Sequence, residues 1–90
     1  MTLGQLTGTW LTDDGRYTMW IGGENNTRIV INYNGKNVLS EYTRFRYDNE
    51  RNICLLSDSV VLYQLFGDYS ILVKVTLGEQ TVELCLSRGR

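Results

Sequence analysis

Hydrophobic and polar residues alternate along most of this chain, in short runs separated by turn residues. The pattern is clearest in three segments, 28–33, 71–77 and 81–87. In the last of these, Val82, Leu84 and Leu86 alternate with more polar positions. Because successive side chains of a β-strand point to opposite faces, the pattern predicts strands that bury one face in a core.

Clusters of Gly, Asn and Asp predict tight turns between these strands. They lie at 13–15, 22–26, 34–35, 48–52, 57–58, 67–68 and 78–79. Asn34-Gly35 is the strongest signal, because a type I′ hairpin turn needs positive φ at both central residues. The chain has no proline and no alanine, so its turns depend on Gly, Asn and Asp, and the best helix former is missing.

One segment leaves two interpretations open. Residues 58–67 carry a possible N-cap at Asp58 and a possible C-cap at Gly67 around an apolar run, as a two-turn helix would. Val60, Val61 and their aromatic neighbours are poor helix formers, and this composition favours a strand.

The sequence therefore predicts an all-β fold in which residues 1–90 form a single β-barrel domain. Its form would be a small antiparallel meander β-barrel of about eight short strands, because closing the sheet removes exposed edges. A two-sheet β-sandwich is the alternative. The expected inward side chains are Trp10, Met19, Ile29, Ile31, Tyr33, Phe45, Leu62, Val73 and Leu84.

The amino-terminal stretch Leu6-Thr7-Gly8-Thr9-Trp10 combines a glycine and a tryptophan on one face of the first expected strand. A glycine there removes a side chain where a bulky neighbour must approach closely. Trp10 would then fill one end of the core. Trp20, after the next turn, is either a partly exposed aromatic residue or part of a second core layer.

This stretch resembles the Gly-x-Trp opening of the calycin barrels, which include lipocalins, fatty-acid-binding proteins and avidins. The resemblance implies a lipocalin-like meander barrel, with the tryptophan at its closed end and an arginine packed across the indole ring. Arg88 follows the last expected strand and would be that arginine. Nothing in the chain matches the biotin pocket of avidins or the helix pair of fatty-acid-binding proteins, so no ligand is carried over.

Charge and composition exclude several classes of function. Nine basic residues against ten acidic ones give a net charge of −1, which argues against nucleic-acid binding. No apolar run is long enough to cross a membrane, so no membrane partner is expected. The amino terminus lacks the features of a secretory signal, which predicts a cytoplasmic protein, or a secreted one if a leader has been removed.

Catalytic and metal-binding patterns are missing. The chain has no histidine, which removes the usual general base and the commonest zinc ligand. Cys54 and Cys85 are expected to be unpaired, with a disulfide as the alternative, and they give no metal site. The acidic residues Asp13, Asp14, Asp48, Glu50 and Asp58 fall in predicted turns, where Asp is favoured for local hydrogen bonding. We therefore expect no enzyme, no metal and no cofactor.

Exposed aromatic, arginine and loop residues remain as binding candidates. Trp20 precedes a polar loop, and a second aromatic-arginine stretch spans 42–47, where Tyr42, Arg44 and Arg46 would share a solvated strand face. The expected partner-binding residues are Trp20, Gly22, Gly23, Asn25, Tyr42, Arg44, Arg46, Asp68 and Tyr69.

Two functions are consistent with these features. The first is a noncatalytic module that binds a protein through loops and one strand face, by analogy with compact bacterial protease inhibitors. The second is a carrier of a small hydrophobic ligand inside a calycin-type barrel. Barrels of about eight strands are just wide enough to be filled by their own side chains, which favours the protein-binding module.

Overall fold

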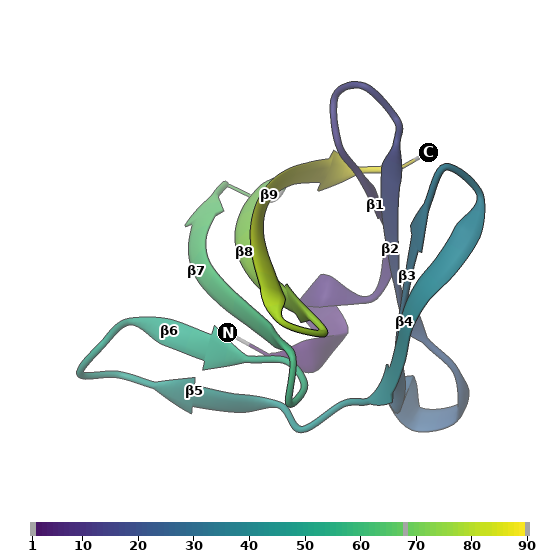
Figure 1. Cartoon of the computed structure of the whole chain (residues 1–90). Coiled ribbons are helices and arrows are strands. Elements are labelled where there is room, and N and C mark those ends of the chain that lie inside the picture. Colours follow the sequence, from purple (N-terminus) through teal and green to yellow (C-terminus); the bar gives the residue numbers. More distant parts are fainter. Residues whose placement is uncertain (1, 68, 90) are drawn as a thin grey trace.

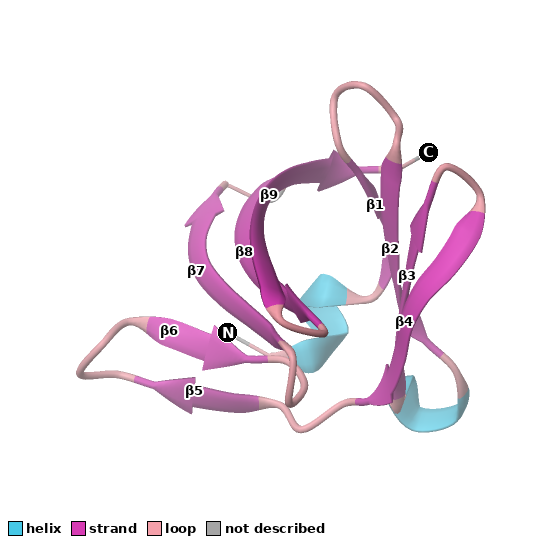
Figure 2. Cartoon of the chain, in the orientation of Figure 1, coloured by secondary structure: helices cyan, strands magenta, loops and turns pink. Residues whose placement is uncertain are grey.

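A computed structural model describes residues 2–67 and 69–89, and these consist mainly of β-strands (Figures 1 and 2). Two short 3-10 helices, η1 (Leu3–Leu6) and η2 (Glu24–Asn26), accompany the strands. The strands are β1 (Gly8–Leu11), β2 (Tyr17–Gly22), β3 (Arg28–Tyr33), β4 (Lys36–Tyr42), β5 (Arg46–Asp48), β6 (Ile53–Leu55), β7 (Val60–Phe66), β8 (Ser70–Leu77) and β9 (Gln80–Arg88). No helix in the described residues is long and apolar enough to span a membrane.

All the strands belong to one antiparallel sheet with the order β4-β3-β2-β1-β9-β8-β7-β6-β5. Every neighbour in this order is also a sequence neighbour except β1 and β9, which pair near the two ends of the chain. The sheet curls into a half-barrel, so that β1–β4 lie across the core from β7–β9 (Figure 1). The predicted all-β meander is confirmed, and segment 58–67 contains a strand, β7, rather than a helix.

The half-barrel differs from the expected closed cylinder at one place. The stretch 42–47, which the sequence predicts as one strand face, is interrupted at residues 43–45, so the described residues form nine strands instead of about eight. At the break, the Thr43 N–H bonds to the Thr27 carbonyl and the Arg44 N–H bonds to the Leu56 carbonyl. The chain therefore crosses from β3 to the end of β6, and β4 and β5 become the two edges of the sheet.

Glu41 of β4 forms a polar link beside this opening. Its carboxylate accepts hydrogen bonds from the Ser57 hydroxyl at 2.7 Å, the Ser59 hydroxyl at 2.8 Å and the Ser59 N–H at 3.1 Å. Burial raises the pKa of Glu41, but these three donors outweigh it, and the pKa lies below its usual value. The link holds β4 to the turn between β6 and β7.

The core is formed by the inward side chains of the curled sheet. Of the predicted inward set, Trp10, Met19, Ile29, Ile31, Leu62, Val73 and Leu84 are buried. Tyr33 and Phe45 are only half-buried, and Phe45 packs against the margin of the core. Cys54 is buried among these side chains, whereas Cys85 is exposed, and both are free thiols as predicted.

One end of the half-barrel is closed by Trp10 and η1, which lies behind the sheet in Figure 1. The Trp10 indole N–H donates to the Leu6 carbonyl at 2.9 Å. The Arg88 guanidinium lies 4.2 Å from the Trp10 ring centroid, as predicted, and donates to the Thr7 and Gln5 carbonyls. Gly8 has a φ of 119°, and a Cβ there would lie 3.2 Å from Arg88 Nη1. The glycine therefore leaves room for the arginine that covers the tryptophan.

The predicted hairpin turn at Asn34-Gly35 is also confirmed. These residues have φ values of 51° and 81°, as a type I′ turn requires. Tyr33 pairs with Lys36 on either side of the turn, and Asn32 pairs with Asn37. Beyond that pair the register shifts by one residue at a β-bulge, so Ile31 pairs with Leu39. The bulge decides which side chains of β4 share a face with those of β3.

Candidate binding site

The outer face of β2, β3 and β4 gathers exposed aromatic, aliphatic and arginine side chains. Two cross-strand rows define it: Trp20, Val30 and Ser40 form one, and Gly22, Arg28 and Tyr42 form the next. Val38 lies two residues before Ser40 on β4 and is 41% exposed. We call this surface the aromatic face; it consists of Trp20, Gly22, Arg28, Val30, Val38, Ser40 and Tyr42.

Trp20 is positioned by the glycine two residues after it. A Cβ atom at Gly22 would lie only 2.5 Å from Trp20 Cζ2, so the indole ring rests directly against the Gly22 backbone. The opposite part of the ring faces solvent, because Trp20 remains 39% exposed. Of the two interpretations of Trp20, the partly exposed one is confirmed. A large rigid ring is therefore presented at the surface with little freedom to move.

Arg28 and Tyr42 form the second fixed pair of the aromatic face. The Arg28 guanidinium lies 5.5 Å from the Tyr42 ring centroid, and its Nη2 donates to the Ser40 hydroxyl at 2.5 Å. Tyr42 is 72% exposed. The cation is held over one side of the phenol ring, and the rest of the ring stays open to a partner.

The loop after β2 is compact rather than extended. Gly23 has a φ of 87° and Asn25 a φ of 60°, and residues 24–26 form the 3-10 helix η2. The Thr27 hydroxyl closes the turn by donating to the Glu24 carbonyl at 2.9 Å. Gly23 lies beside Arg28, since a Cβ there would be 3.8 Å from Arg28 Cβ. The loop thus borders the aromatic face, and its residues 24–26 are helical rather than extended.

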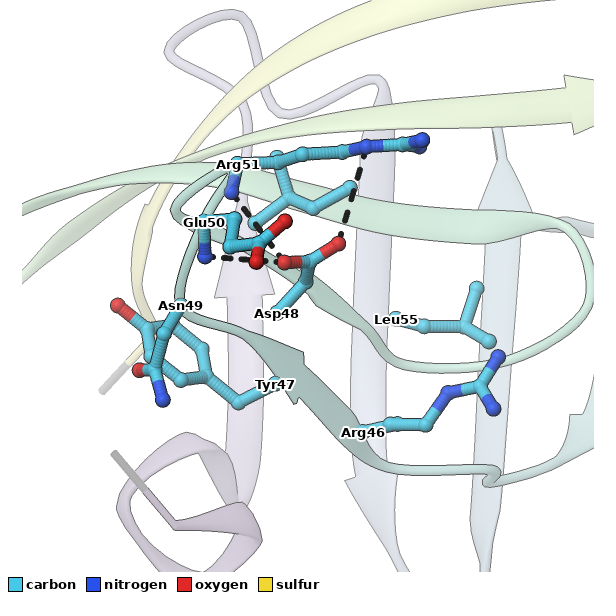
Figure 3. A pocket seen from close by; sticks show the side chains of 8 residues that line it. Arg46, Tyr47, Asp48, Asn49, Glu50, Arg51 and Leu55 are labelled. Carbon is cyan, nitrogen blue, oxygen red and sulfur yellow. Dashed lines mark hydrogen bonds and ion pairs between the residues drawn. The ribbon is translucent and has the colours of Figure 1, made fainter.

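Arg44 and Arg46 lie outside the aromatic face, along the connection to the β5–β6 hairpin. The Arg44 Nε atom is 3.2 Å from Asp58 Oδ1, in an exposed ion pair. Arg46 borders a cleft of about 580 Å³ on the hairpin, shown in Figure 3 with Asp48, Arg51 and Leu55. Two arginines and two carboxylates line that cleft, so their charges balance. The hairpin does not present the continuous arginine face that the sequence suggested.

Two of the acidic turn residues, Asp14 and Asp48, serve local hydrogen bonding, as predicted. Asp48 Oδ1 accepts the N–H groups of Glu50 and Arg51 at 3.0 and 3.2 Å (Figure 3). Asp14 accepts the Thr12 hydroxyl at 2.7 Å and the Arg16 N–H at 2.9 Å. No group of three potential metal ligands occurs among the described residues.

Of the remaining predicted site residues, Tyr69 lies between β7 and β8. Tyr69 is 74% exposed, and its carbonyl accepts the Arg88 N–H at 2.8 Å. Strands β1 and β9 separate this position from β2 in the sheet order. Asp68 lies outside the described residues. The structure therefore joins Trp20, Gly22 and Tyr42 into one surface, with Gly23 and Asn25 in the loop beside it.

Sequence reasoning missed Arg28, although it is central to the aromatic face. A two-residue turn at Asn34-Gly35 without a bulge would place Arg28 opposite Glu41, where the two would form an ordinary ion pair. The bulge in β4 shifts the register so that Arg28 lies opposite Tyr42. Alternation within one strand carries no information about such a shift.

Comparisons with protein-family models, curated proteins and solved structures give no match to this chain. The chemistry of the aromatic face must therefore be interpreted from its own residues.

Proposed function

We propose that this protein is a noncatalytic interaction module that binds another protein through the aromatic face. The observation that carries the proposal is the fixed presentation of Trp20, Arg28 and Tyr42 on one strand surface. Trp, Tyr and Arg are the residue types most enriched at binding hot spots. Because Gly22 and Ser40 already hold two of these side chains, little conformational entropy is lost when a partner binds.

A filled interior supports surface binding over transport of a ligand. The inward side chains Met19, Ile29, Ile31 and Val73 expose 0% of their surface, and Trp10 exposes 1%. A side chain with no surface open to a water-sized sphere cannot line a cavity that holds a ligand. We therefore expect no binding of a fluorescent fatty acid or an anilinonaphthalene dye to the native protein, whereas a carrier would bind either probe.

A noncatalytic role agrees with the environment of the buried thiol. Burial raises the pKa of Cys54 to about 11, which leaves it protonated and unreactive at neutral pH. Cys85 is exposed on β9, and the chain has no histidine to serve as its base.

Protease inhibition is the narrower form of this proposal, within a calycin-like barrel. The stacking of Arg88 on Trp10 supports the barrel type, because this contact is the one that the resemblance implies. The compact loop at 23–26 lacks an extended segment for a protease cleft, so we place the contact on the aromatic face. Titration of serine, cysteine and metalloproteases with the protein tests this form, and an inhibitor would abolish activity at a fixed stoichiometry.

The general proposal is tested by capture of partners from the source organism, followed by titration of the purified partner. The double variant Trp20→Ala, Tyr42→Ala should bind at least about 30-fold more weakly than the wild type, as loss of a hot spot predicts. Tyr69→Ala is the matched control, because it removes an equally exposed tyrosine elsewhere. Equal binding by the double variant, or equal loss in the control, would contradict the assignment of the surface.

A further inference from the structure

Arg28 is held in place at the surface without a carboxylate partner. Arg16, Arg44 and Arg51 each form an ion pair with an aspartate, at 3.8, 3.2 and 3.8 Å. Among the described residues, the Arg28 side chain has no such pair, and its Nη2 donates to the neutral Ser40 hydroxyl. A guanidinium carries several N–H donors and no acceptor, so its charge and most of its donors remain available to a ligand.

Two aromatic rings flank this arginine in one row across the sheet. Gly22 lies on the outward face and is nevertheless buried, because the Trp20 ring rests on its backbone. The row of Gly22, Arg28 and Tyr42 therefore carries the Trp20 ring at β2, the cation at β3 and the phenol ring at β4. The bulge of β4 lies outside this row, toward the turn at 34–35.

The spacing of the two rings matches one kind of peptide backbone. Neighbouring strands lie about 4.8 Å apart, so the β2 and β4 positions of a row are separated by about 9.6 Å. A polyproline II helix repeats its side-chain directions about every three residues, which corresponds to about 9.3 Å along its axis. An extended β-strand instead returns to the same face every second residue, after about 6.7 Å. A polyproline II segment that crosses the strands therefore meets both rings with the same side.

We infer that the aromatic face binds a proline-rich segment of the partner protein in the polyproline II conformation. Prolines three residues apart would pack on Trp20 and Tyr42, and an acidic residue between them would pair with Arg28. The inference rests on the proposed function and names the chemistry of the partner.

Both parts of this ligand suit the groups that the face presents. Aromatic side chains are the usual contacts of proline-rich segments, whose backbone is already ordered and loses little entropy on binding. A carboxylate accepts charge-assisted hydrogen bonds from the free N–H donors of Arg28. Because Ser40 already fixes the guanidinium, the cation needs little reordering to receive it.

Titration of the wild type with synthetic peptides tests the proline part. A peptide of about twelve residues with the repeat Pro-Pro-Glu presents prolines and carboxylates at the required period. Heteronuclear NMR spectra should show a dissociation constant between about 10 µM and about 500 µM, because the contact is smaller than a standard interface. The repeat Ala-Ala-Glu keeps the charge and should bind at least about 10-fold more weakly. Equal binding of the two peptides, or no binding of the first, would overturn the inference.

A second peptide comparison tests the role of Arg28. The wild type should bind the repeat Pro-Pro-Gln about 3-fold to about 10-fold more weakly than Pro-Pro-Glu, as loss of an ion pair predicts. Arg28→Gln should bind these two peptides equally and still prefer proline to alanine. Arg16→Gln is the matched control, because it removes an equal charge from the turn before β2. A preference for Glu that survives Arg28→Gln, or disappears in Arg16→Gln, would overturn the pairing with Arg28.

The last comparison separates this inference from the proposed function. The double variant Trp20→Ala, Tyr42→Ala should lose the Pro-Pro-Glu peptide, whereas Tyr69→Ala should retain it; equal binding by the double variant would overturn the inference. If a captured partner needs the aromatic face but no proline-rich peptide binds, the inference fails and the proposed function stands. If the peptides fail and insoluble cellulose or chitin retains the wild type but not the double variant, the face binds a polysaccharide and both fail.

Discussion

The two tryptophans of the chain lie on paired strands but serve opposite purposes. Thr9 pairs with Trp20 and Trp10 pairs with Met19, so the two indole rings point to opposite faces of the sheet. Trp10 is 1% exposed and closes the core, whereas Trp20 is 39% exposed and forms part of the aromatic face. The same residue type therefore supports folding at one position and offers a contact at the other, and the register across one turn decides which.

The buried Trp10 ring is also held by more contacts than the exposed Trp20 ring. Trp10 donates to the Leu6 carbonyl and lies under Arg88. Trp20 rests on Gly22, and no hydrogen bond from its indole N–H occurs among the described residues. We expect removal of the Trp10 ring to change the free energy of unfolding strongly, and removal of the Trp20 ring to change it little.

The largest effect should come from Trp10→Ala. Removal of a buried tryptophan costs about 3–5 kcal/mol of unfolding free energy, and the Leu6 carbonyl loses its donor as well. Urea denaturation followed by circular dichroism measures the loss. Trp20→Ala is the matched control, with an expected loss below about 1 kcal/mol. Equal losses for the two variants would contradict the contrast between core and surface.

The second-largest loss of stability should come from removing Arg88, which lies over the Trp10 ring. Arg88→Met removes the cation from the indole ring and the donors to the Thr7 and Gln5 carbonyls, at a cost of about 2 kcal/mol. Arg88→Lys should recover only part of this, because an ammonium group cannot reproduce the planar fork of the guanidinium. Full recovery by lysine would show that charge alone matters. Thermal unfolding midpoints of the wild type and the two variants measure their stability, which should fall in the order wild type, Arg88→Lys, Arg88→Met.

A smaller loss of unfolding free energy should come from Gly22→Ala, and its size should depend on the Trp20 ring. Gly22→Ala forces its new methyl group into the indole ring and should cost about 1–2 kcal/mol. In the Trp20→Ala background the ring is absent, so the same substitution should cost much less. A double-mutant cycle measures this difference. An unchanged cost in both backgrounds would mean that Trp20 does not rest on Gly22.

Much of the fold could be predicted from the sequence, because alternation and turn residues report local preferences directly. The Asn34-Gly35 hairpin and all of the inward set except Tyr33 and Phe45 follow from such signals. The contact between Arg88 and Trp10 is instead implied by the resemblance of the Gly-x-Trp opening to calycin barrels. The aromatic face could not be predicted in the same way. It depends on the bulge in β4 and on the break at 43–45, both set by pairing between strands rather than by any residue alone.

The smallest change in stability should come from Asp14, in the turn between β1 and β2. This turn joins the strands that carry the two tryptophans. The Arg16 N–H, and then the Thr12 hydroxyl, hold the pKa of Asp14 below its usual value. The contribution of Asp14 to stability is therefore complete above the carboxyl pKa of the unfolded chain. It is lost as the pH falls through the lower pKa of the folded state.

Asp14→Asn removes the titrating group while keeping an oxygen that can accept the same hydrogen bonds. The difference in thermal unfolding midpoint between the wild type and this variant should be small at neutral pH and should close in acid. Asp13→Asn is the control, because it changes the neighbouring residue of the same turn. A difference between the wild type and Asp14→Asn that stays constant down to the lowest pH would mean that the carboxylate does not hold the turn. The opposite orientation of the two tryptophans would then rest on the strand pairing alone.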